Sequence, residues 1–397
     1  MRRSNSRALL FAAATVSLAL GMDTAWAEPF RPADPAMVLE KLPLKPADPK
    51  MRELRNFRAD LAAKPGDLAL ATRLAWRYFE LVSAEGDPRY VGYAQAALSP
   101  WWSESSPPVE VLVLRATLKQ YRHDFNAALA DLDTAVKDDP NNAQAWSLAS
   151  TIHMVQGRYA EARANCTALQ KVTSDLIGVG CAAVLDALGG KARPAHAALE
   201  AALSRSADAT PEQRLWALTR LGEMAARFGD FALAEKHFKD GLVLGIADGY
   251  LLAAYADLLL DRDRPAEVLA LLKGMNRSDL LLLRIALAEK TLHLAEEVKL
   301  RTELANRFDD AKLRGDKVHQ VEEARFRLHL MGDAAAALAL AKENWTVQKE
   351  TRDARILLET AIAAKNPQAA APVIAWLRET KMEDVLLLRL ATQLQGQ

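Results

Sequence analysis

Residues 123–140 read HDFNAALADLDTAVKDDP and residues 157–174 read GRYAEARANCTALQKVTS, and the two stretches share one pattern. Phe125 and Tyr159 lie 34 positions apart, and each is followed three residues later by an alanine. In both stretches an apolar residue comes next, and a further small or apolar residue follows it. A pattern that returns at a fixed period of this length is typical of a chain built from repeated units.

The spacing of apolar residues predicts that each unit is a pair of helices joined by a tight turn. Trp146, Ala149 and His153 share one face of a helix, because their separations match its turns. Gly157 suits the turn that follows, since glycine adopts backbone angles that other residues avoid. One helix pair cannot bury its apolar face alone, so we expect several stacked units.

This pattern resembles the tetratricopeptide repeat, whose period is 34 residues. Phe231, Ala234 and Phe238 carry it again after Gly229, whereas residues 280–317 fit it poorly. The resemblance implies an all-α fold, a right-handed α-solenoid of stacked antiparallel helix pairs. We expect the chain to be an exported bacterial protein that contains such repeats. The expected divisions are 1–27 (signal peptide), 28–50 (extended lead-in), 51–108 (N-terminal helical cap and divergent repeat), 109–275 (repeat array), 276–317 (irregular helical segment) and 318–397 (C-terminal repeat-like pairs and a cap helix).

The first 27 residues have the pattern of a secretory signal peptide. Arg2, Arg3 and Arg7 precede an apolar run, and residues 25–27 read AWA, a small-x-small cleavage pattern. We therefore expect export to a bacterial periplasm with cleavage after Ala27. The alternative is an uncleaved anchor helix. The apolar run is shorter than the ~20 residues that a spanning helix needs, which favours the signal peptide.

Charge argues against two classes of partner. The chain carries 51 Lys and Arg against 51 Asp and Glu, so no basic excess points to nucleic acid or to a membrane surface. We expect a protein or peptide partner, no nucleic acid, and no integral membrane segment after signal cleavage.

Residue patterns that carry chemistry are missing from the sequence. The seven histidines include no HExxH arrangement, and neither a phosphate-binding loop nor a GxSxG nucleophile motif occurs. We therefore expect no catalytic residues, no metal site and no cofactor. The two cysteines, Cys166 and Cys181, fall by repeat position on neighbouring helices. In an oxidising compartment they are candidates for a disulfide, and two buried free thiols are the alternative.

The resemblance also implies a concave groove lined by the first helix of each pair. We expect a non-catalytic scaffold that binds a partner protein or an extended peptide in this groove. Aromatic residues of the lining, Tyr121, Trp216 and Tyr250, would contact the partner; alternatively, they fill seams between repeats. The rival functions are a small-ligand or glycan-binding solenoid of the cell envelope, with a deep closed pocket near residues 280–317, and an enzyme subunit. The expected partner-binding residues are Tyr121, Gln144, Thr151, Met154, Trp216, Glu223, Arg227, Tyr250 and Asp257.

Overall fold

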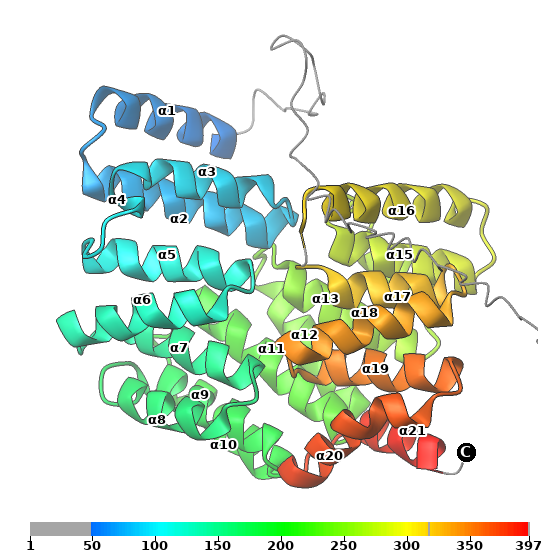
Figure 1. The fold of residues 1–397 in the computed structure, drawn as a ribbon. Coiled ribbons are helices and arrows are strands. Elements are labelled where there is room, and N and C mark those ends of the chain that lie inside the picture. The colour runs from blue at the N-terminus through cyan, green and yellow to red at the C-terminus, as the bar shows by residue number, and fades with distance from the viewer. Residues whose placement is uncertain (1–48, 317, 396–397) are drawn as a thin grey trace, which may run out of the picture.

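The computed structural model describes residues 49–316 and 318–395, in which the regular structure is helical (Figure 1). The expected signal peptide, residues 1–27, and nearly all of the lead-in lie outside the described residues. The helices are α1 (Pro49–Ala63), α2 (Leu68–Glu85), α3 (Arg89–Ala97), α4 (Ser99–Trp102), α5 (Val109–Tyr121), α6 (Phe125–Asp138), α7 (Ala143–Val155), α8 (Tyr159–Leu169), α9 (Asp175–Leu188), α10 (Ala192–Arg205), α11 (Pro211–Arg227), α12 (Phe231–Val243), α13 (Gly249–Asp261), α14 (Pro265–Leu271), α15 (Asp279–Thr291), α16 (Glu297–Leu313), α17 (Gln320–His329), α18 (Ala334–Val347), α19 (Thr351–Ala363), the 3₁₀ turn η1 (Pro367–Ala370), α20 (Ala371–Thr380) and α21 (Val385–Gln395).

Consecutive helices pack as pairs, as the repeat pattern predicts. The pairs α5 and α6, α7 and α8, α9 and α10, α11 and α12, and α17 and α18 make close contact. Each pair also contacts the next, so the chain is a solenoid of stacked helix pairs and the predicted all-α fold is confirmed.

Local chemistry sets the ends of the paired helices. The side chain of Asn142 accepts the backbone N–H of Ala145 and caps α7. Gly157 ends the turn between α7 and α8 with a φ of 72°, a conformation that glycine tolerates best. Ala128 and Ala162 are fully buried, which lets the two helices of each pair approach closely.

The pair α11 and α12 shows how tightly these helices meet. Thr210 and Gln213 form a reciprocal capping box at the start of α11. A β-carbon built on Gly222 would lie 2.5 Å from the ring of Phe238, so only glycine fits at this crossing. Phe238 itself is 1% exposed and belongs to the core of the central repeats.

Residues 276–317 depart from the repeat for a visible reason. The preceding helix, α14, has only seven residues, so the pair of α13 and α14 has one short arm. The longer helices α15 and α16 then form an antiparallel pair of their own. Phe308 of α16 and Phe326 of α17 meet in a core beneath that pair.

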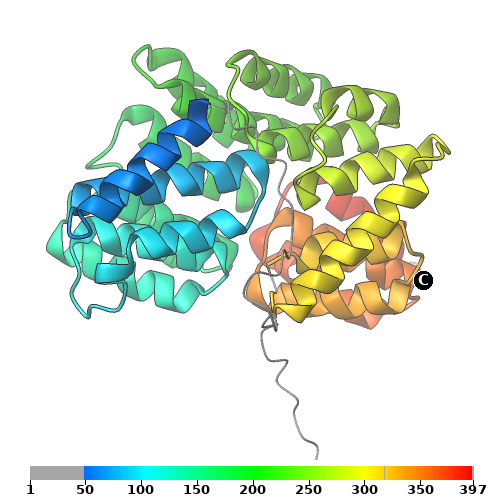
Figure 2. The same cartoon turned by 90° about the horizontal axis from the view of Figure 1, so that it is seen from above.

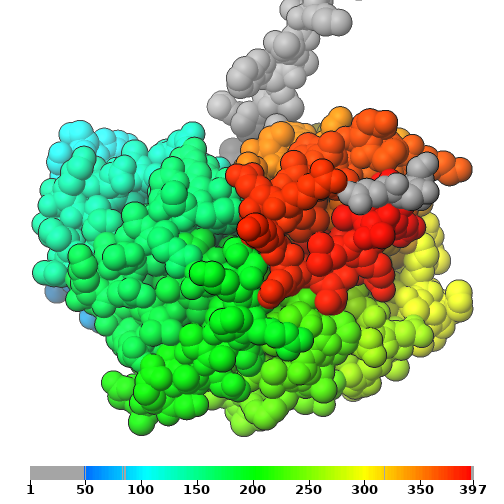
Figure 3. All heavy atoms as spheres, turned by 90° about the horizontal axis from the view of Figure 1, so that it is seen from below, coloured from blue at the N-terminus to red at the C-terminus, as the bar shows by residue number. Residues whose placement is uncertain are grey.

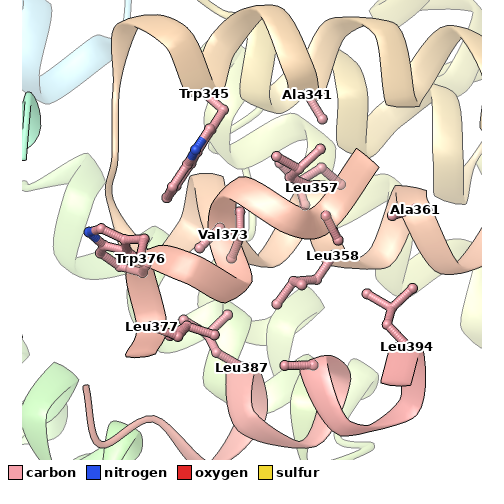
Figure 4. Packing of buried hydrophobic residues seen from close by; sticks show 14 of the residues in the cluster. Ala341, Trp345, Leu357, Leu358, Ala361, Val373, Trp376, Leu377, Leu387 and Leu394 are labelled. Atoms are coloured by element: carbon pink, nitrogen blue, oxygen red, sulfur yellow. The ribbon is translucent and has the colours of Figure 1, made fainter. Parts of the chain in front are cut away.

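The C-terminal pairs share a large apolar core (Figure 4). Trp345 and Trp376 meet edge to face, with ring centroids 5.3 Å apart and planes at 81°. Leu357 and Leu358 of α19 lie beside them, and Leu387 of α21 closes the cluster from below. Helix α21 therefore covers the end of this apolar core.

The solenoid curves until its last pairs touch its early ones. Figure 2 shows the chain running from blue and cyan through green and yellow to orange, and Figure 3 shows the red end against the green middle. The backbone N–H of Lys349 donates to the carbonyl of Val155 at 2.7 Å. Trp376 Nε1–H donates to the hydroxyl of Tyr159 at 2.8 Å, and Glu383 accepts the backbone N–H of Ala192 at 3.0 Å. The expected concave face is therefore covered in part by the C-terminal helices.

A disulfide joins the second and third of the repeat pairs. Cys166 of α8 and Cys181 of α9 are bonded, with their Cα atoms 5.6 Å apart. Both residues are buried beside Leu169, and the Ser150 hydroxyl lies 3.3 Å from Cys181 Sγ. The expected position of the two cysteines on neighbouring helices thus brings their sulfur atoms together.

We predict that the protein, denatured without reductant, has no reactive thiols and gains two after reduction. Reduction should lower the free energy of unfolding by roughly 3 kcal/mol, because the bond limits the freedom of the unfolded chain. Thiol titration and urea unfolding with and without reductant measure both effects. The Cys166→Ala/Cys181→Ala variant is the control and should not respond to reductant. Two reactive thiols in the unreduced protein would contradict the pairing.

Candidate functional site

A cavity of about 770 Å³ lies where the C-terminal helices cover the concave face. One wall comes from the first helices α7, α9, α11 and α13, and the opposite wall from α17, α19 and α21. A volume of this size suits a small molecule or a short stretch of extended chain. The closure of the solenoid therefore creates an interior site in place of an open groove.

Seven of the nine residues expected to bind a partner line this cavity: Thr151, Met154, Trp216, Glu223, Arg227, Tyr250 and Asp257. Gln144 lines a smaller neighbouring cavity of about 420 Å³, which Thr151 also borders. The structure thus brings most of the expected face together around one space.

Tyr121 is placed elsewhere. It is the last residue of α5, and α5 stacks on α2 at that end. Its ring meets Phe79 edge to face at 6.4 Å and joins the N-terminal apolar core. Tyr121 lines neither of the two cavities. Here an aromatic ring does fill a seam between repeats.

Tyr250, Glu223 and Arg220 form a hydrogen-bonded group on the cavity wall. The Tyr250 hydroxyl donates to Glu223 at 2.6 Å, and Arg220 reaches Glu223 at 2.8 Å and the Tyr250 oxygen at 3.0 Å. The Arg220 guanidinium also lies 4.8 Å from the centre of the Tyr250 ring. Burial raises the pKa of Tyr250, and the neighbouring Glu223 carboxylate raises it further.

Asp257 joins the two walls of the cavity. Its carboxylate accepts from Arg284 of α15 at 2.7 Å and from Arg325 of α17 at 2.6 Å. Burial alone would raise the pKa of Asp257, but the two guanidinium groups outweigh it and hold that pKa well below its usual value.

A second ion-pair group crosses the cavity at α19. Arg355 pairs bidentately with Asp261 of α13, at 2.7 and 2.8 Å, and also with Glu359 at 2.7 Å. His329 contacts the other oxygen of Glu359 at 2.9 Å. Burial opposes ionisation, yet Arg355 and His329 lower the pKa of Glu359 to about 2.

Reasoning from the sequence missed the second wall. Arg284, Glu322, Arg325 and Arg355 line the cavity from α15, α17 and α19, and none was expected at the site. Their spacing carried a signal, since Glu322 and Arg325, like Arg355 and Glu359, share one face of a helix. Nothing in the spacing says that this face turns back toward α11 and α13.

Arginine side chains keep the central carboxylates of the wall ionised. Its central carboxylates, Asp257 and Glu359, are each held by arginine and have lowered pKa values, which makes them poor proton donors or acceptors near neutral pH. In residues 49–316 and 318–395, no three His, Cys, Asp or Glu side chains gather as a metal site would require. No helix within the described part of the chain is long and apolar enough to cross a membrane.

We predict that Asp257→Asn lowers the free energy of unfolding by about 3 kcal/mol, because two arginines then lack their carboxylate. Asp240→Asn, which breaks only the exposed pair with Lys236, should change it by at most about 1 kcal/mol. The difference between wild type and Asp257→Asn should shrink as pH falls. The lowered pKa of Asp257 adds stability above the unfolded pKa, about 4, and this contribution is lost as the pH falls through the folded pKa. Urea unfolding from pH 7 to pH 2 measures this, and equal effects of the two substitutions would contradict it.

Residues 121–173 match a family model described as Tetratricopeptide repeat. No curated protein matches the chain. Among solved structures the chain is similar to one of the APC/C hetero-tetramer Cut9-Hcn1, at 12% identity and a TM-score of 0.49 over 87% of this chain and 73% of that one. It is also similar to a tetratricopeptide repeat protein from Parabacteroides merdae, at 17% identity and a TM-score of 0.32 over 72% and 98%, and to yeast Tom70, at 15% identity and a TM-score of 0.35 over 88% and 62%. Residues 121–173 therefore carry a tetratricopeptide repeat match, and they lie within a solenoid of stacked helix pairs.

Proposed function

We propose that this tetratricopeptide repeat protein is a non-catalytic scaffold that holds an extended segment of a partner protein in its central cavity. Proteins of this repeat family generally bind other proteins. The observation that carries the proposal is the convergence of the concave faces of α7, α9, α11 and α13 on one space.

The chemistry of the wall suits a polypeptide segment. An extended segment presents backbone N–H and C=O groups, and buried backbone groups need partners. The hydroxyls of Ser147 and Thr151 and the charged groups of Glu223 and Arg352 offer donors and acceptors. Met154, Trp216 and Phe231 offer apolar contact to side chains of the segment.

We extend the proposal to the cellular setting. The signal pattern of residues 1–27 supports export to a bacterial periplasm with cleavage after Ala27. The Cys166–Cys181 bond supports the same setting, since disulfides persist in oxidising compartments.

One rival deserves a test because a specific observation favours it. A small ligand or glycan of the cell envelope would need a deep pocket, and the cavity of about 770 Å³ between the first helices and α17, α19 and α21 has the volume for one. The pocket lies beside α11 and α13, and from the segment where such a pocket was expected, residues 280–317, Arg284 lines its wall.

Photo-crosslinking from inside the cavity tests the proposal. We would replace Thr151, which lines the cavity, by the photoreactive residue benzoylphenylalanine, and would do the same at Thr167 as a control. Thr167 is exposed on α8, the outer helix of the same pair, and its hydroxyl makes the same i−4 backbone bond as that of Thr151. Irradiation in cell-envelope extract, followed by mass spectrometry of the adducts, identifies what reaches each position.

We expect one peptide segment of another protein to be attached at position 151 and absent at position 167. Attachment of the same protein at both positions would place the contact outside the cavity. A small-molecule adduct at position 151 alone would favour the small-ligand function and contradict the scaffold.

A further inference from the structure

The charges on the cavity wall do not cancel. The wall carries nine arginine or lysine side chains and seven aspartate or glutamate side chains. Five of the arginines are held in ion pairs with wall carboxylates, as described above for Arg220, Arg284, Arg325 and Arg355, and for Arg352 with Glu350 at 2.8 Å. Among the described residues, Arg227, Arg262, Lys349 and Arg389 have no ion-pair partner.

The two carboxylates without an ion pair offset these cations only in part, since the charge of Asp384 acts on Arg227. Asp384 accepts the backbone N–H groups of Leu386 and Leu387, both at 3.0 Å, and so caps α21. Glu322, which is 7% exposed, lies in the paired part of the wall, where its charge acts on Arg284 and Arg352. The wall therefore keeps an excess of two positive charges, which comes from the four cations without an ion pair.

Three of the four come from chain segments that meet at one edge of the cavity, and we call this set the arginine mouth: Arg227, Arg262 and Arg389. Arg227 ends α11 and Arg262 directly follows α13, and these two neighbouring first helices end on the same side. The Arg262 guanidinium lies 4.7 Å from the centre of the Phe231 ring, just after α11.

Arg389 reaches the same edge from α21. It lies one turn after Val385, whose methyl carbon would be 3.4 Å from a β-carbon built on Gly229. Arg262 and Arg389 line the cavity and are also exposed, so they lie where the cavity opens to solvent. Lys349 lies apart, at the contact with Val155 and Gly157.

Arg227 has a hydrogen-bonding group that the protein leaves unused. Its Nη1 atom is buried and has no acceptor, and its Nε–H reaches only the Glu223 carbonyl at 3.4 Å. A guanidinium N–H removed from water without an acceptor costs free energy, so such groups are rare in folded proteins. A ligand oxygen at this point would remove that cost.

We infer that the arginine mouth selects an acidic segment, and that its carboxylates bind Arg227, Arg262 and Arg389 as the segment enters the cavity. The inference rests on the proposed scaffold function and names the chemistry of the partner segment. The three arginines come from three segments of the chain, two of them exposed and one with a buried guanidinium nitrogen, and such a set can bind several carboxylates along one chain. Arginine forms two parallel hydrogen bonds with a carboxylate, which gives direction as well as charge attraction.

Three labelled ten-residue peptides test the inference: one alternates Glu and Gly, one Lys and Gly, and one Ser and Gly. Fluorescence polarisation gives their dissociation constants for the wild-type protein at low salt. Arg227→Gln, Arg262→Gln and Arg389→Gln each remove one cation of the mouth. Arg122→Gln is the matched control, because Arg122 is exposed at the end of α5 and lines neither cavity.

We expect the acidic peptide to bind most tightly, and each mouth variant to weaken it by about tenfold, as for one lost charge-assisted hydrogen bond. Arg122→Gln should leave the dissociation constant unchanged. Arg262 and Arg389 are exposed, so their variants should keep the thermal melting temperature of the wild-type protein, which separates lost binding from lost folding.

Other outcomes overturn the inference in distinguishable ways. If the neutral or basic peptide binds best and, when added before irradiation, prevents the benzoylphenylalanine adduct at position 151, the segment is not acidic but the scaffold function stands. If inorganic phosphate displaces the acidic peptide when both supply the same concentration of negative charge, the arginine mouth is a site for small anions. If no peptide binds, both the inference and the proposed function fail.

Discussion

The cavity depends on the contact between the two ends of the solenoid. Stacked helix pairs have no intrinsic end, and each pair adds a small rotation to the curve. In this chain the curve brings the loop after α18 against α7, where the Lys349 backbone N–H meets the Val155 carbonyl at 2.7 Å. Trp376 and Tyr159 make a second junction. Without these junctions the concave face would be an open groove, and the enclosed space between the two walls would not exist.

Ion pairs inside the cavity reinforce this closure and also polarise it. Asp257 and Asp261 of α13 are bound by arginines of α17 and α19, so the two walls attract one another directly. The carboxylates in these ion pairs are bound by arginines of the opposite wall and are not paired with the remaining cations. The remaining cations are left on one side, at the ends of α11 and α13 and on α21. The same arrangement that holds the walls together therefore gives the opening its positive charge.

The sequence was informative about local structure and silent about closure. The pattern around Phe125 and Tyr159 predicted paired helices, and the position of first-helix residues such as Thr151, Trp216 and Tyr250 predicted one cavity wall. Tyr121 does not line the cavity, because the same helical position packs on α2 near the start of the array. The wall from α17, α19 and α21 could not be predicted, because curvature accumulates from small rotations in every pair. A short helix such as α14 changes that sum without leaving a recognisable motif.

A designed disulfide across the junction tests closure most directly. A β-carbon built on Gly157 would lie 3.8 Å from Cβ of Lys349, which is the usual separation of bonded cysteines. The account predicts that Gly157→Cys/Lys349→Cys forms a second intramolecular disulfide under mild oxidation, seen by mass spectrometry as four cysteines without a free thiol. The pair Gly157→Cys/Arg314→Cys, whose second cysteine lies at the end of α16, should keep two free thiols. Two free thiols in the junction variant would contradict a closed solenoid and, with it, the enclosed site.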